Sequence, residues 1–427
     1  GYVYLGGGTK LQQKLGVDDT PDQMYAYLTA AGGETASKEA IRIACDNAPN
    51  LYEWCEEVGM EFPERLDEGY IVDARVPGVG LAYSGNERAF RLAKVTPPVP
   101  RGHLVSPDGN GMGVCRPLNA AVEAAGIQVM YNTRGTALVT NDNGRVVGVV
   151  VDGEGGTQNI KARRGVALTC GGFGLNEEWM KAVYPFSTKL GTHITAAPPE
   201  DGSGIRMGID IGADTHGMSR FQSGMPLYTY SVSCCKGMLI DGNGQRIAAE
   251  NEYNSFIGGR IVRSNLSAAY LIVTDEIAAE IAQDLDMSRV SPTILKADSV
   301  VDLAEQVGVA PETLQNTFDA YEAGVAAGQD FAYGKAEKFL VSLKSGPYTA
   351  YYLGSDICYN GTLGGLRINT DAQVLDTDGE PIPGLYAAGR NSGLFYGFYM
   401  GSGTSMLDCF TFGRIAGQKL AEEQPVD

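Results

Sequence analysis

The spacing of apolar and polar residues predicts a helix near each end of the chain. Thr20 is followed by Pro21 and then by Gln23, the spacing of a capping box with proline at the first helical position. A second helix is expected from about Thr404, because apolar and small residues recur there at helical intervals. These residues are Met406, Phe410, Gly413, Gly417 and Leu420. Two glycines on this face would let it approach a neighbour closely.

Shorter apolar runs between turn signals predict strands. From Ala125 onward, such runs are separated by Asp142-Asn143-Gly144 and by Asp152-Gly153, which is typical of a hairpin region. A buried strand is expected at 166–169, running into Gly171-Gly172, and another at 385–388, running into Gly389. Together with the helices, these strands predict an α/β fold with α+β elements.

The composition changes between about Thr215 and Gly354. This part has more tyrosines, the pair Cys234-Cys235 and a helical pattern around Leu314, Phe318 and Tyr321. A chain of 427 residues is long for one core, and we expect two domains as a starting estimate. We interpret the middle part as an inserted domain.

Charge and the rarer residue types exclude several classes of function. The net charge of −18 argues against a nucleic-acid partner, which would require a basic patch. Eight cysteines without C-x-x-C spacing and three scattered histidines make a metal site improbable, and the cysteines are expected to be thiols. No apolar run is long enough for a transmembrane helix. We expect a cytoplasmic protein, although the start at Gly1 leaves an export signal ahead of it open.

Glycine clusters mark the ends of several predicted strands. They are Gly6-Gly7-Gly8, Gly171-Gly172, Gly364-Gly365 and the run from Gly389 to Gly403. Each cluster alone is typical of a turn. In combination they are more informative, because "GSGTSM" opens the last helix and its free N–H groups would suit an anionic or electron-rich ligand.

Several longer segments carry a family resemblance. "GEPIPGLYAAGR" followed by "GSGTSMLDCFTFGRIAG", together with "GTLGGLRI", "LTCGGFG" and "DGSG", resembles the flavoprotein superfamily of fumarate reductases, succinate dehydrogenase flavoprotein subunits and 3-ketosteroid dehydrogenases. The resemblance extends over essentially the whole chain. Within the superfamily, "YLGGGTKLQQKLG", "YSGNE" and "PRGH" are most similar to the 3-ketosteroid Δ4-dehydrogenases.

This resemblance implies a discontinuous Rossmann-like FAD-binding domain, at 1–215 and 353–427, with an inserted substrate or capping domain at 216–352. The G-x-G-x-x-G βαβ unit of the superfamily has no counterpart in the sequence, so we expect the pyrophosphate-binding turn to lie outside it. The cofactor residues implied by the resemblance are Gly6, Gly7, Gly8, Ala137, Leu138, Gly171, Asp201, Gly389, Arg390, Gly403, Ser405 and Met406. Ser405 and Met406 would face the flavin pyrimidine, whose reduced form a helix N-terminus stabilises.

The resemblance also separates two substrate classes. Fumarate reductases hold a dicarboxylate with arginine and histidine, and those positions here hold Asn254 and Gly361, while a further arginine has no counterpart in "YMGSG". Fumarate is therefore a poor candidate, because an uncompensated buried carboxylate is costly. Tyr253, three residues after Glu250, matches the catalytic tyrosine of the Δ4-dehydrogenases, where it would polarise a ketone. A merely packed tyrosine remains the alternative.

The second catalytic tyrosine of the family has no direct counterpart, because the family's Tyr-x-Ser-Gly is here "FYMGSG", with Met400 at the tyrosine position. Either Tyr399 replaces that tyrosine through a small backbone shift, or Tyr253 acts with another group. Tyr396, four residues before Met400, is a further candidate for this role. Ser402 matches the family serine and is a candidate for proton transfer, and a helix-capping hydroxyl is its alternative role.

We therefore expect an FAD-dependent oxidoreductase acting on the C–C bond next to a ketone, most plausibly in a 3-oxosteroid or fused-ring enone. Hydride would pass between the substrate β-carbon and flavin N5, with an external electron donor or acceptor setting the direction. One alternative is a reductase of a non-fumarate α,β-unsaturated carboxylate, which requires Arg206, Arg260 or Arg263 in the site. Another is a partial chain or subunit that completes a flavin site with a partner.

Overall fold

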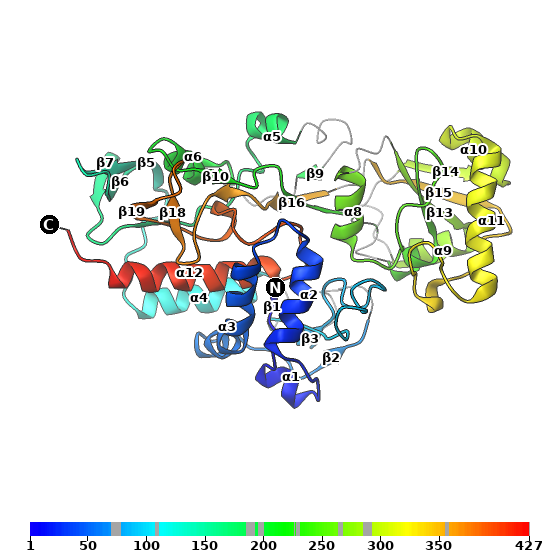
Figure 1. The fold of residues 1–427 in the computed structure, drawn as a ribbon, viewed down its shortest axis with the longest axis horizontal. Helices are drawn as coiled ribbons and strands as arrows, with labels where there is room; N and C mark the ends of the chain where they lie inside the picture. Colours follow the sequence, from blue (N-terminus) through cyan, green and yellow to red (C-terminus); the bar gives the residue numbers. More distant parts are fainter. Residues whose placement is uncertain are drawn as a thin grey trace.

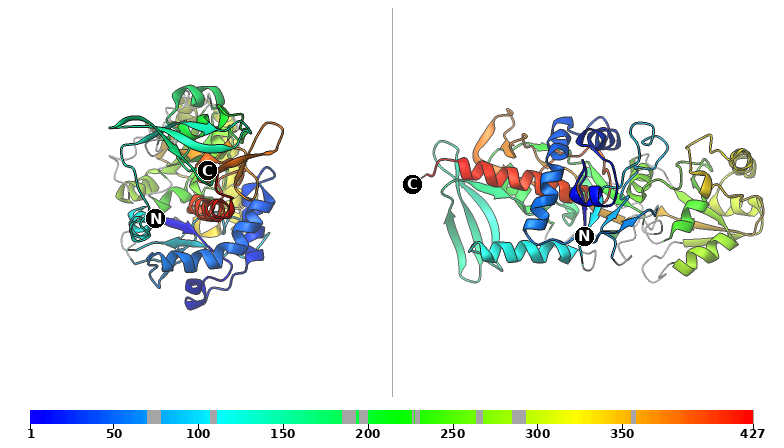
Figure 2. Two further views of the ribbon diagram at one scale, coloured as in Figure 1. Left: turned by 90° about the vertical axis from the view of Figure 1, so that its left-hand side faces the viewer. Right: turned by 90° about the horizontal axis from the view of Figure 1, so that it is seen from below.

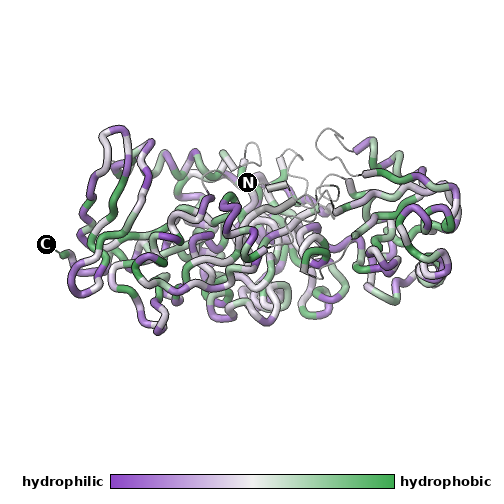
Figure 3. The backbone as a smooth tube through the Cα atoms, turned by 90° about the horizontal axis from the view of Figure 1, so that it is seen from above, coloured by the Kyte–Doolittle hydropathy of each residue, from purple (hydrophilic) through white to green (hydrophobic). Residues whose placement is uncertain are grey.

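The computed structural model is elongated, with one sheet at each end of its long axis (Figures 1 and 2). It describes residues 1–69, 78–106, 111–184, 193–194, 200–225, 227, 231–263, 268–284, 293–354 and 358–426. Hydrophobic stretches occur at both ends and in the middle of the molecule (Figure 3). The core cluster accordingly extends through the whole chain rather than occupying one part of it.

The N-terminal part combines a small sheet with three helices. The sheet has the order β1-β4-β3-β2 and contains β1 (Tyr2–Tyr4), β2 (Leu66–Asp67), β3 (Leu81–Ala82) and β4 (Gly102–Leu104). The helices are α1 (Lys10–Lys14), α2 (Pro21–Gly32) and α3 (Lys38–Glu57). The predicted capping box is confirmed, because the Thr20 side chain accepts from Gln23 N and the Gln23 side chain accepts from Thr20 N. Thr9 and Gln12 form a second one at α1.

The predicted hairpin region is confirmed as an antiparallel sheet at one end of the molecule. It comprises β5 (Arg134–Thr140), β6 (Val146–Gly153) and β7 (Gly156–Lys161), and it is preceded by α4 (Gly111–Ala124). The strand predicted at 166–169 is β8 (Val166–Leu168), but Ala167 is exposed, so the expectation of a buried strand is wrong. The reason is position: among the described residues, β8 is the edge of the sheet β18-β19-β8.

The parallel pair β8 and β19 carries the glycine turns toward the centre of the molecule. β19 (Pro381–Ala387) pairs with β8 in parallel and with β18 (Gln373–Leu375) in antiparallel fashion, and it leads into the 3₁₀ turn η5 (Gly389–Asn391). Two short helices follow β8, α5 (Glu177–Val183) and α6 (Ser203–Ile209). The carboxyl ends of parallel strands are where α/β folds place their ligands.

The last helix, α12 (Thr404–Glu422), begins where the sequence predicts and packs against α3, β1 and β19. One expectation about it is wrong. A Cβ added to Gly413 or Gly417 would meet no atom within 4 Å, so these glycines permit no close approach. The buried residues of α12 include Phe410 from the predicted stripe, but also Leu407, Phe412 and Ala416, which lie outside it.

The middle of the chain forms a second sheet at the opposite end (Figure 1). Its order is β12-β13-β15-β14, from β12 (Met238–Asp241), β13 (Ala269–Thr274), β14 (Thr293–Ala297) and β15 (Tyr348–Tyr352). Around it lie α9 (Asp275–Asp284), α10 (Val300–Val307), α11 (Pro311–Ala327), η2 (Val232–Lys236) and η3 (Glu337–Phe339). Leu314, Phe318 and Tyr321 are buried on α11, as predicted. The boundaries at 215/216 and 352/353 stay a prediction.

Short elements connect the two ends. They are β9 (His193–Ile194), β10 (Thr215–His216), β11 (Phe221–Gly224), β16 (Cys358–Thr362), β17 (Gly365–Leu366) and α8 (Asn254–Arg263). β11 pairs with β16, and α8 packs on β11. The loop ahead of α8 and the loop ahead of α12 therefore meet in the middle of the molecule.

Candidate active site

Tyr253 and Ser402 lie side by side, although 149 residues separate them in the sequence. The Tyr253 hydroxyl and Ser402 Oγ are 2.8 Å apart. Tyr253 directly precedes α8, and its carbonyl accepts from Phe256 N in the first turn of that helix at 2.8 Å. Burial raises the pKa of Tyr253, and the neighbouring Tyr399 adds to the shift. The hydroxyl therefore stays protonated across the physiological range and can donate a hydrogen bond.

Two further tyrosines extend this contact. The Tyr399 ring centroid lies 6.4 Å from that of Tyr253, and the Tyr396 ring stacks on Tyr399 at 5.9 Å. Met400, at the family's tyrosine position, is turned the other way: a Cβ added to Gly32 on α2 would lie 3.0 Å from its sulfur. Met400 is thus a packing residue at the position where the family has a tyrosine. Tyr399 is the tyrosine of this segment that lies beside Tyr253.

The start of α12 excludes the capping role considered for Ser402. The N-cap residue is Gly403, with φ 93°, and no side chain caps the helix. A Cβ at Gly403 would lie 2.6 Å from Tyr4 N, so the position requires glycine for both its φ and its packing. The Thr404 hydroxyl donates to Gly401 O. Ser402 is left to contact Tyr253, and the positive end of α12 is left without a side-chain acceptor.

Arg390 supplies a cation at the same helix end. Its guanidinium donates to Ser405 Oγ at 3.0 Å, to Gln222 Oε1 at 3.1 Å and to Thr362 O at 2.8 Å. A Cβ added to Gly361 would lie 2.1 Å from Arg390 Nη1. The place where the dicarboxylate enzymes carry a histidine is therefore filled by the guanidinium of Arg390.

Two of the three arginines considered for a carboxylate clamp, Arg206 and Arg260, have other partners. The Arg206 guanidinium lies over the Trp179 ring, with 5.1 Å from Cζ to the ring centroid. Arg260 donates to Ile247 O at 2.7 Å and pairs with Glu252 at 3.5 Å. The side chain of Arg263 lies outside the described residues. The two described side chains are thus held by partners of their own rather than free to bind a substrate carboxylate.

One predicted residue, Asp201, lines a cavity of about 570 Å³ between β5 and α6. Asp201 accepts from Ser203 N at 2.9 Å and is paired with Arg134. Partial burial alone would raise the pKa of Asp201, but the hydrogen bonds from Arg134 and Ser203 outweigh it and lower the pKa. Ala137 and Leu138 belong to β5, and Gly171, with φ 84°, faces the Glu200 side chain.

The glycines at 6–8 are explained by the protein's own packing. Gly7 N donates to Asp19 Oδ2 at 2.9 Å, and a Cβ on Gly6 would lie 2.7 Å from the same oxygen. Asp19 forms a fully buried ion pair with Arg101 at 2.7 Å. The glycine run therefore wraps a buried salt bridge just after β1. Its assignment to the cofactor stays a prediction.

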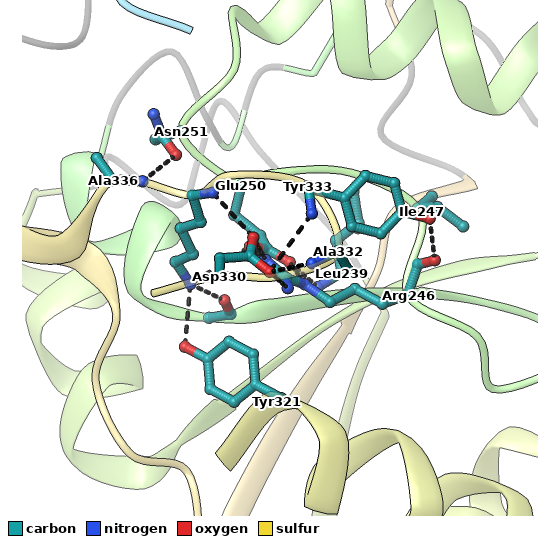
Figure 4. Close-up of polar contacts among 12 residues, drawn as sticks. Leu239, Arg246, Ile247, Glu250, Asn251, Tyr321, Asp330, Ala332, Tyr333 and Ala336 are labelled. Carbon is teal, nitrogen blue, oxygen red and sulfur yellow. Dashed lines mark hydrogen bonds and ion pairs between the residues drawn. The ribbon is translucent and has the colours of Figure 1, made fainter. Parts of the chain in front are cut away.

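A buried charge cluster supports the loop that carries Tyr253 (Figure 4). Arg246 binds both Glu250, at 2.9 and 2.7 Å, and Asp330, at 2.7 and 2.9 Å. Lys335 lies 3.3 Å from Glu250, whose exposed fraction is 0%. Burial opposes ionisation of Glu250, but Lys335 and Arg246 prevail and lower its pKa. From sequence, only the spacing of "GQRIAAENEY" hints at this cluster.

Further sequence expectations concern the cysteines, metal ligands and membrane spans. Seven described cysteines are free thiols, namely Cys45, Cys55, Cys115, Cys170, Cys234, Cys235 and Cys409, and the Cys358 side chain lies outside the described residues. Within the described ranges, no group of three potential metal ligands gathers. No helix among them is long and apolar enough to span a bilayer. Sequence reasoning missed Asn86 and Tyr27, which contact the backbone of both site loops.

Comparison with known proteins adds a family and several relatives. The family model described as "FAD binding domain" matches residues 6–406. The solved 3-ketosteroid-Δ4-(5α)-dehydrogenase of Rhodococcus jostii RHA1, in complex with 4-androstene-3,17-dione, is similar with a TM-score of 0.88 and 33% identity, over 99% of this chain and 88% of that one.

Curated sequences point to the same superfamily. A probable fumarate reductase of Shewanella frigidimarina is 27% identical over 97% of this chain. A urocanate reductase of Eggerthella lenta is 28% identical over 96% of it. The chain spans 66% of the length of each of these two relatives, just under two thirds.

Proposed function

Because the chain belongs to the FAD-binding family whose model covers residues 6–406, we propose that it is an FAD-dependent oxidoreductase acting on the C–C bond next to a ketone. A 3-oxosteroid or a similar fused-ring enone is the proposed substrate. The proposal rests on one observation above the others, the 2.8 Å contact between the Tyr253 hydroxyl and Ser402 Oγ at the uncapped start of α12.

The described residues fit the cofactor. At the start of α12, the helix dipole and the Arg390 guanidinium concentrate positive charge beside Ser405, which suits the electron-rich pyrimidine edge of a flavin. Gly389, Arg390, Gly403, Ser405 and Met406 would hold this end. Asp201, which lines the cavity between β5 and α6, would hold the other end together with Ala137, Leu138 and Gly171. When bound, FAD supplies or accepts the hydride.

The tyrosines define what the protein itself contributes. A protonated Tyr253 donates to a ketone oxygen and stabilises the negative charge that develops there as an enolate. Ser402 Oγ accepts from or donates to the Tyr253 hydroxyl, so the two hydroxyls can pass a proton between them. Tyr399, whose ring is tilted against that of Tyr253, offers a second hydroxyl-bearing ring for the α-carbon proton.

The choice of a ketone over a carboxylate rests on charge. Asn254 and Gly361 replace the cationic positions of the dicarboxylate enzymes, and the Arg206 and Arg260 side chains are engaged elsewhere. A buried carboxylate without cationic partners would be strongly disfavoured. The similarity to a dehydrogenase solved with 4-androstene-3,17-dione supports the same class.

A second candidate is a reductase of an α,β-unsaturated carboxylate other than fumarate. The observation that favours it is Arg390, whose guanidinium occupies the space beside Gly361. The sequence similarity of the chain to a urocanate reductase also supports this alternative. Arg390 would have to leave Thr362, Gln222 or Ser405 to bind a substrate carboxylate, which makes this candidate the weaker one.

A substrate panel tests the proposal. The complete protein, isolated with its flavin, is mixed without oxygen with a saturated 3-oxosteroid, a 4-en-3-one, urocanate, acrylate and fumarate, and the visible spectrum is followed. We expect flavin bleaching by the saturated ketone, or reoxidation of the reduced protein by the enone, and neither with fumarate. A protein that stays colourless after incubation with FAD would disprove the flavin assignment, and turnover of carboxylates alone would favour the second candidate.

A further inference from the structure

The segment "SGNE", residues 84–87, is hydrogen-bonded to both loops of the proposed site. Ser84 O accepts from Ser402 N at 2.7 Å, and Gly85 pairs with Gly401 in an antiparallel bridge. On its other side, Asn86 Oδ1 accepts from Tyr253 N at 2.5 Å. One short segment thus holds the backbone of both residues whose hydroxyls meet.

Tyr27, on α2, closes this arrangement. Its hydroxyl donates to Met400 O and accepts from Asn86 N, each at 2.8 Å. Tyr27 is 1% exposed and Asn86 is 4% exposed, so water competes for neither bond. A Cβ on Gly85 would lie 2.4 Å from the Tyr27 hydroxyl, which explains the glycine. In "YSGNE", the glycine therefore stands where the Tyr27 hydroxyl approaches the backbone, and the asparagine stands where its side chain can accept from Tyr253 N.

The contacts form a closed circuit. It runs from the Tyr253 hydroxyl to Ser402, along the backbone to Met400, through the Tyr27 hydroxyl to Asn86, and through the Asn86 side chain back to Tyr253 N. We propose that Tyr27 and Asn86 are positioning residues, which set the Tyr253 hydroxyl against Ser402 by tying the loop before α8 to the loop before α12. The catalytic part of this inference rests on the proposed function.

The circuit matters because the two loops belong to different parts of the chain. The charge cluster around Glu250 anchors the Tyr253 loop on its own side, through Arg246 and Lys335 (Figure 4). Among the contacts described above, Asn86 Oδ1 joins Tyr253 N to the segment 84–87. Ser84, Gly85 and Tyr27 then join that segment to residues 400–402. A displacement of about 1 Å at such a contact can lower a rate roughly 100-fold without removing any reacting group.

Two variants break the circuit, and one serves as a matched control. Tyr27→Phe removes the hydroxyl but keeps the ring, and Asn86→Ala removes the acceptor for Tyr253 N. Tyr348→Phe is the control, because the Tyr348 hydroxyl also donates to a backbone carbonyl, Leu343 O at 3.1 Å, and is 2% exposed. Tyr27→Phe loses two buried hydrogen bonds and Tyr348→Phe loses one, so Tyr27→Phe should lose more stability of the two.

Amide hydrogen exchange of the complete, flavin-loaded protein tests the circuit without any substrate. Exchange in residues 251–254 should accelerate about three- to tenfold in Tyr27→Phe and in Asn86→Ala, and stay unchanged in Tyr348→Phe. Unchanged exchange at 251–254 in both circuit variants would overturn the proposal, whatever the protein's reaction is. An equal acceleration in Tyr348→Phe would overturn it too, since the effect would then be general loosening.

Turnover tests the positioning role separately. In Tyr27→Phe, kcat for the 3-oxosteroid or enone should fall roughly 10- to 100-fold with KM and flavin content nearly unchanged. The double variant Tyr27→Phe/Tyr253→Phe should be no slower than Tyr253→Phe alone, because Tyr27 acts through Tyr253. Multiplying effects would overturn the positioning role. A wild-type protein that turns over no ketone or enone would remove the proposed function, while the exchange experiment would still decide the circuit.

Discussion

At the scale of single residues, the site depends on hydroxyl groups rather than on charges. Tyr253, Tyr399 and Ser402 approach one another in a partly buried setting, and the Arg390 guanidinium is committed to three hydrogen bonds. Hydroxyl donors suit a neutral ketone whose oxygen becomes negative only during the reaction. A ground-state dianion such as fumarate would require cations instead.

Replacing Tyr253 with phenylalanine tests this chemistry directly. The ring remains, while the donor to the developing enolate is lost, so turnover of a 3-oxosteroid should fall by about 10²–10³. The flavin should stay bound, because Tyr253 lies outside the residues that would hold it. Tyr270→Phe is the control and should leave turnover unchanged, because Tyr270 lies on β13 in the sheet β12-β13-β15-β14. Full activity of Tyr253→Phe, with chemistry rate-limiting, would exclude Tyr253 from the site.

His103 gives stability a pH dependence. Burial lowers the pKa of His103 from 6.5 to about 4, and it contacts Thr9 and Arg101 O. Between pH 6.5 and 4 the unfolded chain binds this proton while the folded protein does not. Stability from this group is therefore complete above pH 6.5 and falls as the pH decreases, by about 1.4 kcal/mol per unit.

The measurement is denaturant unfolding at pH 7 and pH 5. The difference in free energy of unfolding should be about 2 kcal/mol smaller in His103→Gln than in the wild type, because 1.5 pH units lie in the window. An identical difference in the two proteins would contradict this assignment.

At the scale of elements, glycines decide how the ends of strands and helices meet. Gly403 gives α12 its left-handed start and lets the helix lie against β1, where Tyr4 N donates to Gly403 O at 3.1 Å. Arg390, within the turn η5 that follows β19, then meets Ser405 on the first turn of the helix. The positive charge at this point is thus positioned by backbone geometry.

Gly403→Ala should damage this junction. The φ of 93° is strained for alanine, and its Cβ would lie 2.6 Å from Tyr4 N, so the start of α12 must shift. We expect a loss of at least about 1 kcal/mol of stability and weaker FAD retention, measured by unfolding and by flavin released on dilution. Gly413→Ala is the control, since its Cβ would meet nothing within 4 Å and alanine favours helix. Equal flavin retention in the two variants would argue against a flavin at this helix end.

The buried charge cluster around Glu250 stabilises the loop that leads into α8. Glu250→Ala would leave Arg246 with one carboxylate partner and Lys335 buried without its anion. Removing one partner of a buried ion pair typically costs about 3–5 kcal/mol. The expected result is a large drop in the unfolding midpoint. Glu177→Ala, at an exposed pair with Lys181, should change stability by less than about 0.5 kcal/mol.

At the scale of the whole molecule, two sheets at opposite ends hold a site made from loops between them (Figure 1). A core of this extent needs no disulfide framework. Thiol titration of the unfolded protein without reductant should therefore give close to eight groups per chain, one for each cysteine. A count near zero would show that the cysteines pair after all.

The sequence by itself determined the local structure and the family. The capping box at Thr20, the helix from Thr404 and the hairpins after Ala125 depend on neighbouring residues, so their patterns can be read directly. The family resemblance likewise comes from continuous segments. It also pointed to Tyr253 and Ser402, but as separate motifs with more than one role open to each.

Only the tertiary structure decided which of those roles is geometrically available. Ser402 contacts Tyr253 instead of capping α12, Met400 faces α2 while Tyr399 faces Tyr253, and Gly413 and Gly417 face open space. Arg390 fills the space beside Gly361, and Asn86 with Tyr27 joins the two loops. Each of these facts depends on residues that are far apart in sequence. The direction of a side chain is set by the packing of the element that carries it, which no local pattern encodes.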